Sequence, residues 1–207
     1  ADNGYGNAIN VVRTVREFEH AGVAGIHLED QTWPKRCGHM LGKALIPKEE
    51  MCQKLKAALD AREDPDFVII ARCDAMLVNG LDDVIDRCDA YIEAGADMLF
   101  CEVREDMDEI KAVANHFKDR VPLHWNHSPS PMGPRMSAKE VEALGYKTCC
   151  FYVQSLMAAA KTMQEVLGQI YRTGTSEGVV ERMIGFDELW EINDMSSIRD
   201  MEKKYAV

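Results

Sequence analysis

The sequence predicts an α/β fold of repeated strand–helix units, arranged as a (β/α)8 barrel. Three observations support this prediction. Apolar runs of strand length alternate with segments of helical periodicity. Three helical segments end at glycine corners, namely Ala21–Gly22, Ala94–Gly95 and Leu144–Gly145. Polar residues follow the predicted strands, and the carboxyl ends of strands are where barrel enzymes build their sites.

Composition narrows the class of protein. The chain has 207 residues, enough for one domain, and a net charge of −11, which argues against nucleic acid as a partner. No apolar run reaches membrane-spanning length. The seven cysteines are scattered without C-x-x-C spacing, as expected of reduced thiols in a cytoplasm.

The first half of the chain divides into alternating segments. Residues 1–7, ADNGYGN, resemble the tail of a strand and the loop after it. The elements that follow are a helix at Asn10–Ala21, a strand at Gly25–Gln31, a loop at residues 33–43, a helix from Pro47 to about Arg62, and a strand at Asp66–Asp74. This last strand, DFVIIARCD, is apolar on both faces, which is typical of a parallel strand covered on each side.

The second half continues the pattern. Its predicted elements are a helix at Leu81–Ala94, a strand at Asp97–Val103, a helix at Met107–Phe117, a strand at Val121–Asn126, a helix at Ala138–Leu144, a strand at Lys147–Val153 and a long helix at Ser155–Tyr171. A break at Gly174–Gly185 precedes an acidic helical region at Asp187–Tyr205.

Strand–helix alternation fits either a doubly wound sheet or a barrel. No G-x-G-x-x-G follows a strand, which weakens the dinucleotide-binding alternative. A barrel needs eight strands, and the sequence supplies five plus a tail, so we expect two or three further units upstream of this sequence. We expect residues 1–170 to form the barrel portion and residues 171–207 a helical segment that contacts another subunit or packs on its own barrel.

The most informative stretch is GIHLEDQTWPKRCGHMLGK, from Gly25 to Lys43. A buried strand ends in two carboxylates, Glu29 and Asp30, and a cationic loop with one thiol, Cys37, comes next. Such a loop is a poor core segment, and it suits the handling of a metal-bound anionic substrate.

Four segments together resemble the isocitrate lyase/phosphoenolpyruvate mutase superfamily: ADNGYGN, IHLEDQ, PKRCGHMLGK and ARCDA. The resemblance runs from Ala1 to about Ala160 and is greatest for the carbon–carbon lyase branch with a KRCGH loop, to which 2-methylisocitrate lyases belong. It implies a Mg2+-dependent (β/α)8 barrel, with Mn2+ as a substitute, and a homotetramer whose C-terminal helices are swapped between subunits.

The resemblance also implies a metal site. Its predicted ligands are Asp2, Glu29 and Glu102, hard oxygen donors of the kind Mg2+ prefers. A helix-capping role for Asp2, and ion pairs for Glu29 and Glu102, are the structural alternatives. Asp30 either joins this site or pairs with a nearby base.

Cys37 matches the cysteine that acts as general acid/base in the family. Lyases of this kind leave a carbanion, which must be protonated, and Lys35, Arg36 and His39 are expected to lower the pKa of the thiol. The alternative, a small buried hydrophobe, suits Cys88, Cys149 and Cys150 better than Cys37.

The resemblance assigns the remaining site residues to substrate binding. Arg72 matches the arginine that grips the carboxylate of the 2-oxo acid. The NHSPS segment resembles the carboxylate-binding segment of isocitrate lyases. The predicted substrate-binding residues are Arg72, Asn126, Ser128, Ser130, Ser155 and Gly38. His27 is either a site residue or a core histidine, and Lys43 either a site residue or a solvated one.

Two classes of function remain open. The first is a lyase that releases a 2-oxo acid from a methylisocitrate- or alkylmalate-like 2-hydroxyacid, with oxaloacetate hydrolysis as a related reaction. The second is phosphonate rearrangement, as in carboxyphosphonoenolpyruvate mutases. Cys37 and the serines of NHSPS favour the lyase, whose expected partner is a small anionic carboxylate.

Overall fold

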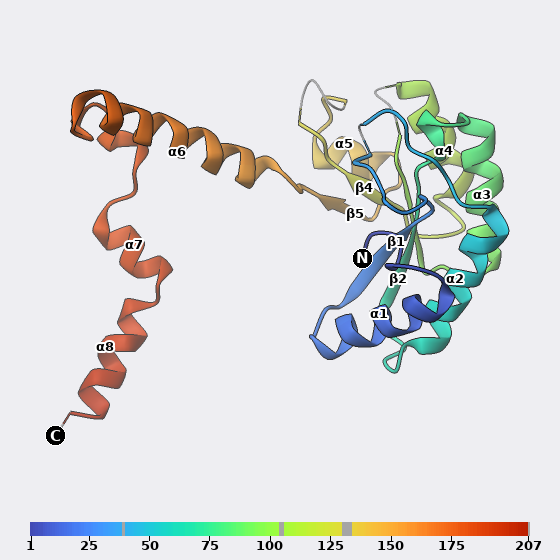
Figure 1. Ribbon diagram of the computed structural model, residues 1–207, viewed down its shortest axis with the longest axis horizontal. Coiled ribbons are helices and arrows are strands. Elements are labelled where there is room, and N and C mark those ends of the chain that lie inside the picture. The colour runs from blue at the N-terminus through green and yellow to red at the C-terminus, as the bar shows by residue number, and fades with distance from the viewer. Residues whose placement is uncertain (39, 104–105, 130–133, 207) are drawn as a thin grey trace. The chain divides into compact units, whose positions relative to one another are not determined.

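The computed structural model describes residues 1–38, 40–103, 106–129 and 134–206. The chain forms two compact units, Ala1–Tyr152 and Val153–Val207 (Figure 1). The division predicted at residue 170 lies inside helix α6 (Gln154–Thr173), which belongs entirely to the second unit.

The first unit contains the strand–helix repeats. Its elements are α1 (Ala8–His20), β1 (Gly25–Glu29), α2 (Lys48–Ala61), β2 (Val68–Cys73), the short 3-10 helix η1 (Ala75–Leu77), α3 (Leu81–Glu93), β3 (Met98–Cys101), α4 (Met107–Phe117), β4 (His124–Asn126), α5 (Ala138–Ala143) and β5 (Thr148–Cys150). All five predicted strands are confirmed, each shorter than its apolar run.

The strands are parallel and neighbour one another in chain order. β1, β2 and β3 form one sheet, β4 pairs with β5, and a parallel bridge between Leu99 and Leu123 links β3 to the segment before β4. Sequential order is typical of a barrel, whereas the strand order of a doubly wound sheet reverses at a switch point.

Local sequence explains where the helices begin and end. The Asn7 side chain accepts hydrogen bonds from the N–H groups of Ile9 and Asn10 at 3.0 and 3.4 Å and so caps α1. The three predicted glycine corners carry positive φ angles, 82° at Gly22, 102° at Gly95 and 106° at Gly145. Glycine adopts this conformation without steric cost, so each helix ends where the sequence predicts.

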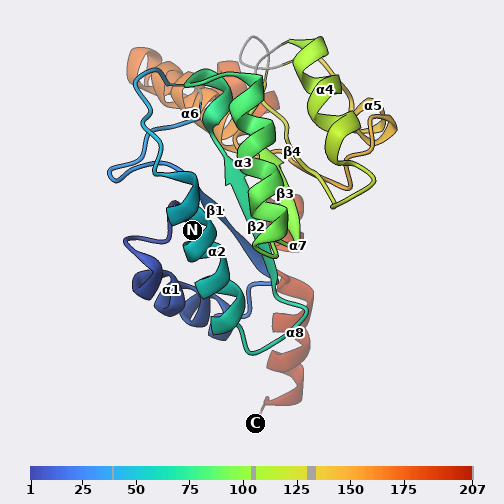
Figure 2. The same ribbon diagram turned by 90° about the vertical axis from the view of Figure 1, so that its right-hand side faces the viewer.

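Successive side chains along each strand point alternately to a core face and to a face that carries the candidate site. Helices α1 to α4 lie side by side along the sheet (Figure 2), and the residues of β1 and β2 that pack with them include Ile26, Leu28 and Ile69, at most 5% exposed. The residues between these point to the opposite face. Register then places Glu29 beside Arg72, and Arg72 beside Phe100.

The second unit is helical. It comprises α6, the 3-10 segment η2 (Glu177–Arg182), α7 (Phe186–Ile192) and α8 (Met195–Lys204). The predicted region Asp187–Tyr205 is thus two helices, separated at Asp194, whose φ of 52° ends helical geometry. No described residue from 153 onward is buried. Among the described residues, no helix combines the length and apolar character that crossing a membrane requires.

Candidate active site

Arg72 is the centre of the site. It lies near the carboxyl end of β2, and its guanidinium contacts three carboxylates: Asp74 at 2.9 and 3.1 Å, Glu102 at 3.0 Å and Glu29 at 3.6 Å. Phe100 packs beneath it, with its ring centroid 4.5 Å from the guanidinium carbon. Burial opposes the charge of Arg72, but Asp74, Glu102 and Glu29 outweigh burial and raise its pKa. Arg72 is therefore a permanent cation with a fixed orientation.

A second cation stands where two predicted metal ligands converge. The ammonium nitrogen of Lys35 lies 3.2 Å from Glu29 and 3.7 Å from Asp2. Glu29 is buried, and desolvation raises its pKa despite the nearby Arg72. Two carboxylates around one cation, in a partly dry site, fit Mg2+, which binds through one or two carboxylates and keeps several waters.

The third predicted metal ligand has a different neighbour. Glu102 pairs with Arg72, and Glu29 pairs with Lys35 and Arg72, so the ion pairs given as the structural alternative are present for both residues. Within residues 1–38, 40–103, 106–129 and 134–206, no group of three or more His, Cys, Asp or Glu side chains is arranged to hold a metal ion. Asp2 and Glu29 are consequently the residues that fit the metal best.

A cavity of about 260 Å3 opens over Arg72. Six predicted site residues line it, namely Lys35, Cys37, Gly38, Arg72, Glu102 and Asn126. The structure thus brings an exposed thiol and a buried guanidinium, from positions 37 and 72 of the chain, to one cavity. An anion held by Arg72 would occupy the cavity that Cys37 lines.

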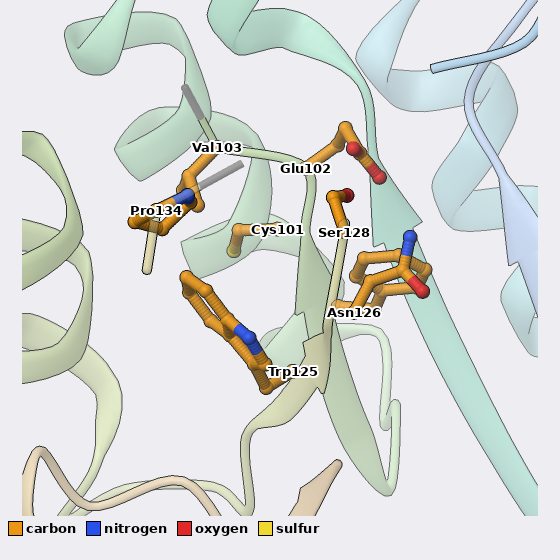
Figure 3. A pocket seen from close by; sticks show the side chains of 8 residues that line it. Cys101, Glu102, Val103, Trp125, Asn126, Ser128 and Pro134 are labelled. Atoms are coloured by element: carbon orange, nitrogen blue, oxygen red, sulfur yellow. The ribbon is translucent and has the colours of Figure 1, made fainter. Parts of the chain in front are cut away.

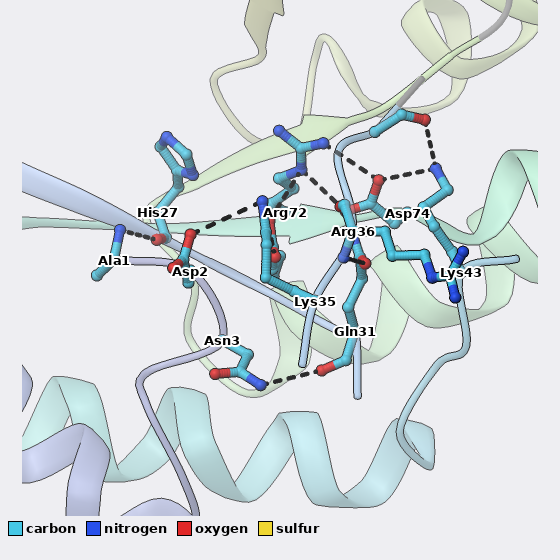
Figure 4. A network of polar contacts seen from close by, with 12 residues as sticks. Ala1, Asp2, Asn3, His27, Gln31, Lys35, Arg36, Lys43, Arg72 and Asp74 are labelled. Atoms are coloured by element: carbon cyan, nitrogen blue, oxygen red, sulfur yellow. Dashed lines mark hydrogen bonds and ion pairs between the residues drawn. The ribbon is translucent and has the colours of Figure 1, made fainter. Parts of the chain in front are cut away.

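The loop that carries Cys37 is held to the end of β1. Gln31 accepts a hydrogen bond from the N–H of Arg36 at 2.9 Å and donates one to its carbonyl at 3.0 Å (Figure 4). The guanidinium of Arg36 donates to the carbonyl of Leu41 at 3.3 Å, so it points along the loop. His39, predicted to act with Cys37, Lys35 and Arg36 in catalysis, lies outside the described residues.

Two residues left ambiguous by the sequence are placed clearly. Asp30 is fully buried, accepts hydrogen bonds from the Tyr91 hydroxyl at 2.7 Å and the Asp74 N–H at 2.9 Å, and pairs with Arg87 at 3.4 Å. Its role is to pair with a base. The solvated alternative for Lys43 is wrong, because the side chain is 1% exposed and pairs with Asp74.

The predicted NHSPS segment is only partly described. Asn126 and Ser128 line a small pocket of about 10 Å3 beside Glu102 (Figure 3), and the Ser128 hydroxyl lies 3.2 Å from the hydroxyl of Tyr152. Ser130 lies outside the described residues. Ser155 belongs to the second unit, where it is exposed in the first turn of α6.

Sequence reasoning missed several residues on the cavity wall, namely Phe100, His124, Cys150 and Tyr152, and left His27 undecided. The two-residue period of strands is the signal that finds them, since His124 precedes Asn126 by two positions and Cys150 precedes Tyr152 by two. Burial lowers the pKa of His27 to about 4, and burial together with Arg72 lowers that of His124. His27 is therefore neutral at neutral pH.

Comparisons with known proteins agree with this arrangement. A family model described as phosphoenolpyruvate phosphomutase matches residues 1–171. The chain is 42% identical to 2,3-dimethylmalate lyase of Eubacterium barkeri over 208 residues and 39% identical to 2-methylisocitrate lyase of Aeropyrum pernix over 206. It is 37% identical over 210 residues to the chloroplastic carboxyvinyl-carboxyphosphonate phosphorylmutase of Arabidopsis thaliana. All of the chain is matched in each case, and it spans 71%, 65% and 61% of those proteins.

Solved structures resemble the chain over nearly its whole length. A 2,3-dimethylmalate lyase described as a PEP mutase/isocitrate lyase superfamily member superposes with a TM-score of 0.89 at 29% identity, covering 100% of this chain and 68% of its own. Phosphonopyruvate hydrolase in complex with oxalate and Mg2+ superposes with a TM-score of 0.86 at 32% identity, and the match covers 100% of this chain and 71% of the hydrolase chain. Oxaloacetate acetylhydrolase with the inhibitor 3,3-difluorooxalacetate superposes with a TM-score of 0.89 at 30% identity, and the match covers 98% of this chain and 68% of the acetylhydrolase chain.

Proposed function

Because this chain belongs to the phosphoenolpyruvate phosphomutase family, within the PEP mutase/isocitrate lyase superfamily, we propose that it is part of a Mg2+-dependent lyase. The proposed reaction cleaves a carbon–carbon bond of a 2-hydroxy di- or tricarboxylate and releases a 2-oxo acid. One observation carries the proposal: Cys37 and the fork of Arg72 line the same cavity, so a proton donor lies beside an anion-binding group. The similarity to 2,3-dimethylmalate and 2-methylisocitrate lyases supports the same reaction class.

Each residue has a defined task in this proposal. Arg72 binds the carboxylate that becomes part of the 2-oxo acid, through its charge and the guanidinium N–H groups that Asp74 and Glu102 leave over. The substrate hydroxyl passes its proton to water and becomes the new carbonyl, and the electrons of the breaking bond pass to the neighbouring carbon beside its carboxylate. Cys37 donates a proton to that carbanion. Asp2 and Glu29 would hold Mg2+, whose charge, when the ion is bound, stabilises the oxygen atoms of the 2-oxo acid.

Two related reactions are the second candidates. The relative from Arabidopsis thaliana is named a carboxyvinyl-carboxyphosphonate phosphorylmutase, and a structural neighbour is an oxaloacetate acetylhydrolase. Either would use Arg72 to bind an anionic substrate. The lyase is favoured because an alkylmalate cleavage requires a proton donor beside the cavity, and Cys37 supplies one.

A substrate panel tests the function. We expect one of 2,3-dimethylmalate, 2-methylisocitrate and isocitrate to yield pyruvate or glyoxylate with the full-length protein and Mg2+, with activity lost in EDTA and restored by added Mg2+. Coupled reduction of the released 2-oxo acid measures the rate. Turnover of a phosphonate or of oxaloacetate alone, with none of the hydroxyacids cleaved, would replace the lyase by one of the second candidates.

The complete barrel and the assembly are also proposals. We propose that the five strands belong to a (β/α)8 barrel and that the C-terminal helices are exchanged between subunits of a homotetramer. The second unit supports this assembly, since apolar side chains are exposed on α6 and α7, including Leu156 (68%), Leu167 (64%) and Phe186 (74%). The free state of all seven cysteines supports a cytoplasmic location.

Light scattering on the full-length protein checks the assembly. We expect a mass close to four chains, and we expect Leu167→Glu to shift that mass toward smaller species, because a carboxylate would be buried in the proposed contact. Arg172→Glu, on the same helix, is the control for added negative charge. A monomeric mass for the unaltered protein would contradict the proposed tetramer.

A further inference from the structure

A buried carboxylate behind the cavity joins the two elements that carry the proposed chemistry. Asp74 follows β2 and is 0% exposed. It accepts four side-chain hydrogen bonds, from Gln31 at 3.0 Å, Lys43 at 3.0 Å and Arg72 at 2.9 and 3.1 Å (Figure 4). Burial alone would raise the pKa of Asp74, but Arg72 and Lys43 lower it to about 2, so the group is a carboxylate at neutral pH.

Two of these donors also hold the loop on either side of Cys37. Gln31 bonds both the N–H and the carbonyl of Arg36, the residue before the cysteine. Lys43 donates to the carbonyl of Gly38, the residue after it, at 2.7 Å. The backbone on both sides of Cys37 is therefore tied to side chains that are themselves tied to Asp74.

The loop backbone lies directly against Arg72. A β-carbon added at Gly38 would stand 2.5 Å from the terminal guanidinium nitrogen of Arg72 and 2.9 Å from the carboxyl carbon of Glu102. Neither distance is compatible with a side chain. The position of the loop, and with it the thiol, thus depends on close contact with the guanidinium that Asp74 orients.

The burial of Lys43 requires a structural explanation. Buried lysines are rare, because taking an ammonium out of water costs several kcal/mol unless a partner compensates. Lys43 has Asp74 as a charged partner and donates a second hydrogen bond to the carbonyl of Gly38 in the loop. A surface lysine could neutralise charge equally well, but it could not fix the carbonyl of Gly38.

We propose that Asp74, acting through Lys43 and Gln31, is a positioning residue that clamps the loop on both sides of Cys37 over the Arg72 guanidinium. The catalytic consequence rests on the lyase function proposed above, whereas the clamp itself can be measured without substrate. Replacing Lys43 releases the loop after the thiol and leaves the contacts between Asp74 and Arg72 in place.

Trypsin provides the substrate-free measurement, because the bond between Arg36 and Cys37 is cleaved only when the loop opens locally. With the full-length protein, we expect Lys43→Met to raise the rate of cleavage after Arg36, followed by mass spectrometry, at least tenfold. We expect kcat to fall about 100-fold and KM to change less than threefold, because the orienting contact of Arg72 remains. Lys48→Met, which removes the surface pair of Lys48 with Asp86, is the matched control and should change none of these.

The double variant Lys43→Met/Asp74→Asn tests whether Lys43 holds the loop or only neutralises the charge of Asp74. It removes both charges of the Lys43–Asp74 pair but also takes a carboxylate from Arg72, so it should regain only part of the thermal stability that Lys43→Met loses. The proposal requires that cleavage after Arg36 stay fast in the double variant. Recovery of both stability and protection from trypsin, or unchanged cleavage in Lys43→Met, would overturn the clamp. Altered cleavage in a protein that turns over none of the hydroxyacids would instead retain the clamp and reject the lyase.

Discussion

Replacing Cys37 with serine should lower kcat for 2-hydroxyacid cleavage by about 1,000-fold and leave KM within about threefold. A general acid contributes a factor of about 100 to 10,000, and the serine hydroxyl is a far weaker acid than a thiol. Binding should survive, because Arg72 holds the substrate carboxylate and the loop is attached through its backbone at Arg36 and Gly38 rather than through the thiol. Steady-state kinetics on the full-length protein measure both constants.

The cavity supplies its own control for this experiment. Cys150 is the other exposed cysteine on the cavity wall. Cys150→Ser makes the same chemical change at the end of β5 and should keep kcat within about threefold of the unaltered protein. Equal losses in the two variants, or full activity in Cys37→Ser, would remove Cys37 from the role of proton donor.

The second large effect is expected from Arg72→Lys, which should lower kcat/KM by about 1,000-fold. The substitution keeps the positive charge and removes the guanidinium N–H groups that remain for the substrate once Nε and Nη2 are bonded to Asp74. Losing two charge-assisted hydrogen bonds, worth about 1.5–3 kcal/mol each, corresponds to a factor of 100 or more. In addition, a single ammonium cannot reach Glu29, Asp74 and Glu102 with the distances that the guanidinium makes.

Arg62→Lys is a matched control for Arg72→Lys. It lies just after α2 and pairs with Asp97 at the opposite end of the strands, away from the cavity. Arg62→Lys should leave kcat/KM within about threefold. Urea unfolding of both variants separates stability from catalysis, and a loss of activity in Arg72→Lys that merely follows its unfolding would contradict a binding role.

The sequence predicted the order of elements in the first unit because each strand carries a local signal. An apolar run bounded by polar residues, followed by a helix that ends at glycine, needs no knowledge of the partner strands. Strand lengths were less predictable: the apolar run Asp97–Val103 yields only Met98–Cys101 as strand, since pairing with β2 and the bridge to Leu123 set its limits. The break at Asp194 carried no signal as strong as a glycine or proline.

Some residues of the site could be predicted from the sequence, and others could not. Cys37 and Arg72 were assigned to the site through the resemblance to the family, and both are also locally unusual, as a thiol in a cationic loop and an arginine at the end of an apolar strand. Asp74 and Gln31 could not be predicted, since their importance depends on partners such as Lys43 that only the fold brings near. His124 could have been found, because Asn126 was already assigned to the site and the two-residue period of strands puts His124 on the same face.

The anchoring of the cysteine at residues 36 and 38 also bears on how such a loop can diverge. Met40 and Leu41 at its far end are 59% and 82% exposed, and their side chains take no part in holding the thiol. A descendant could therefore exchange those two residues while the proton donor stayed where it is. The outer part of the loop can thus vary in sequence while the backbone on both sides of Cys37 keeps its attachment.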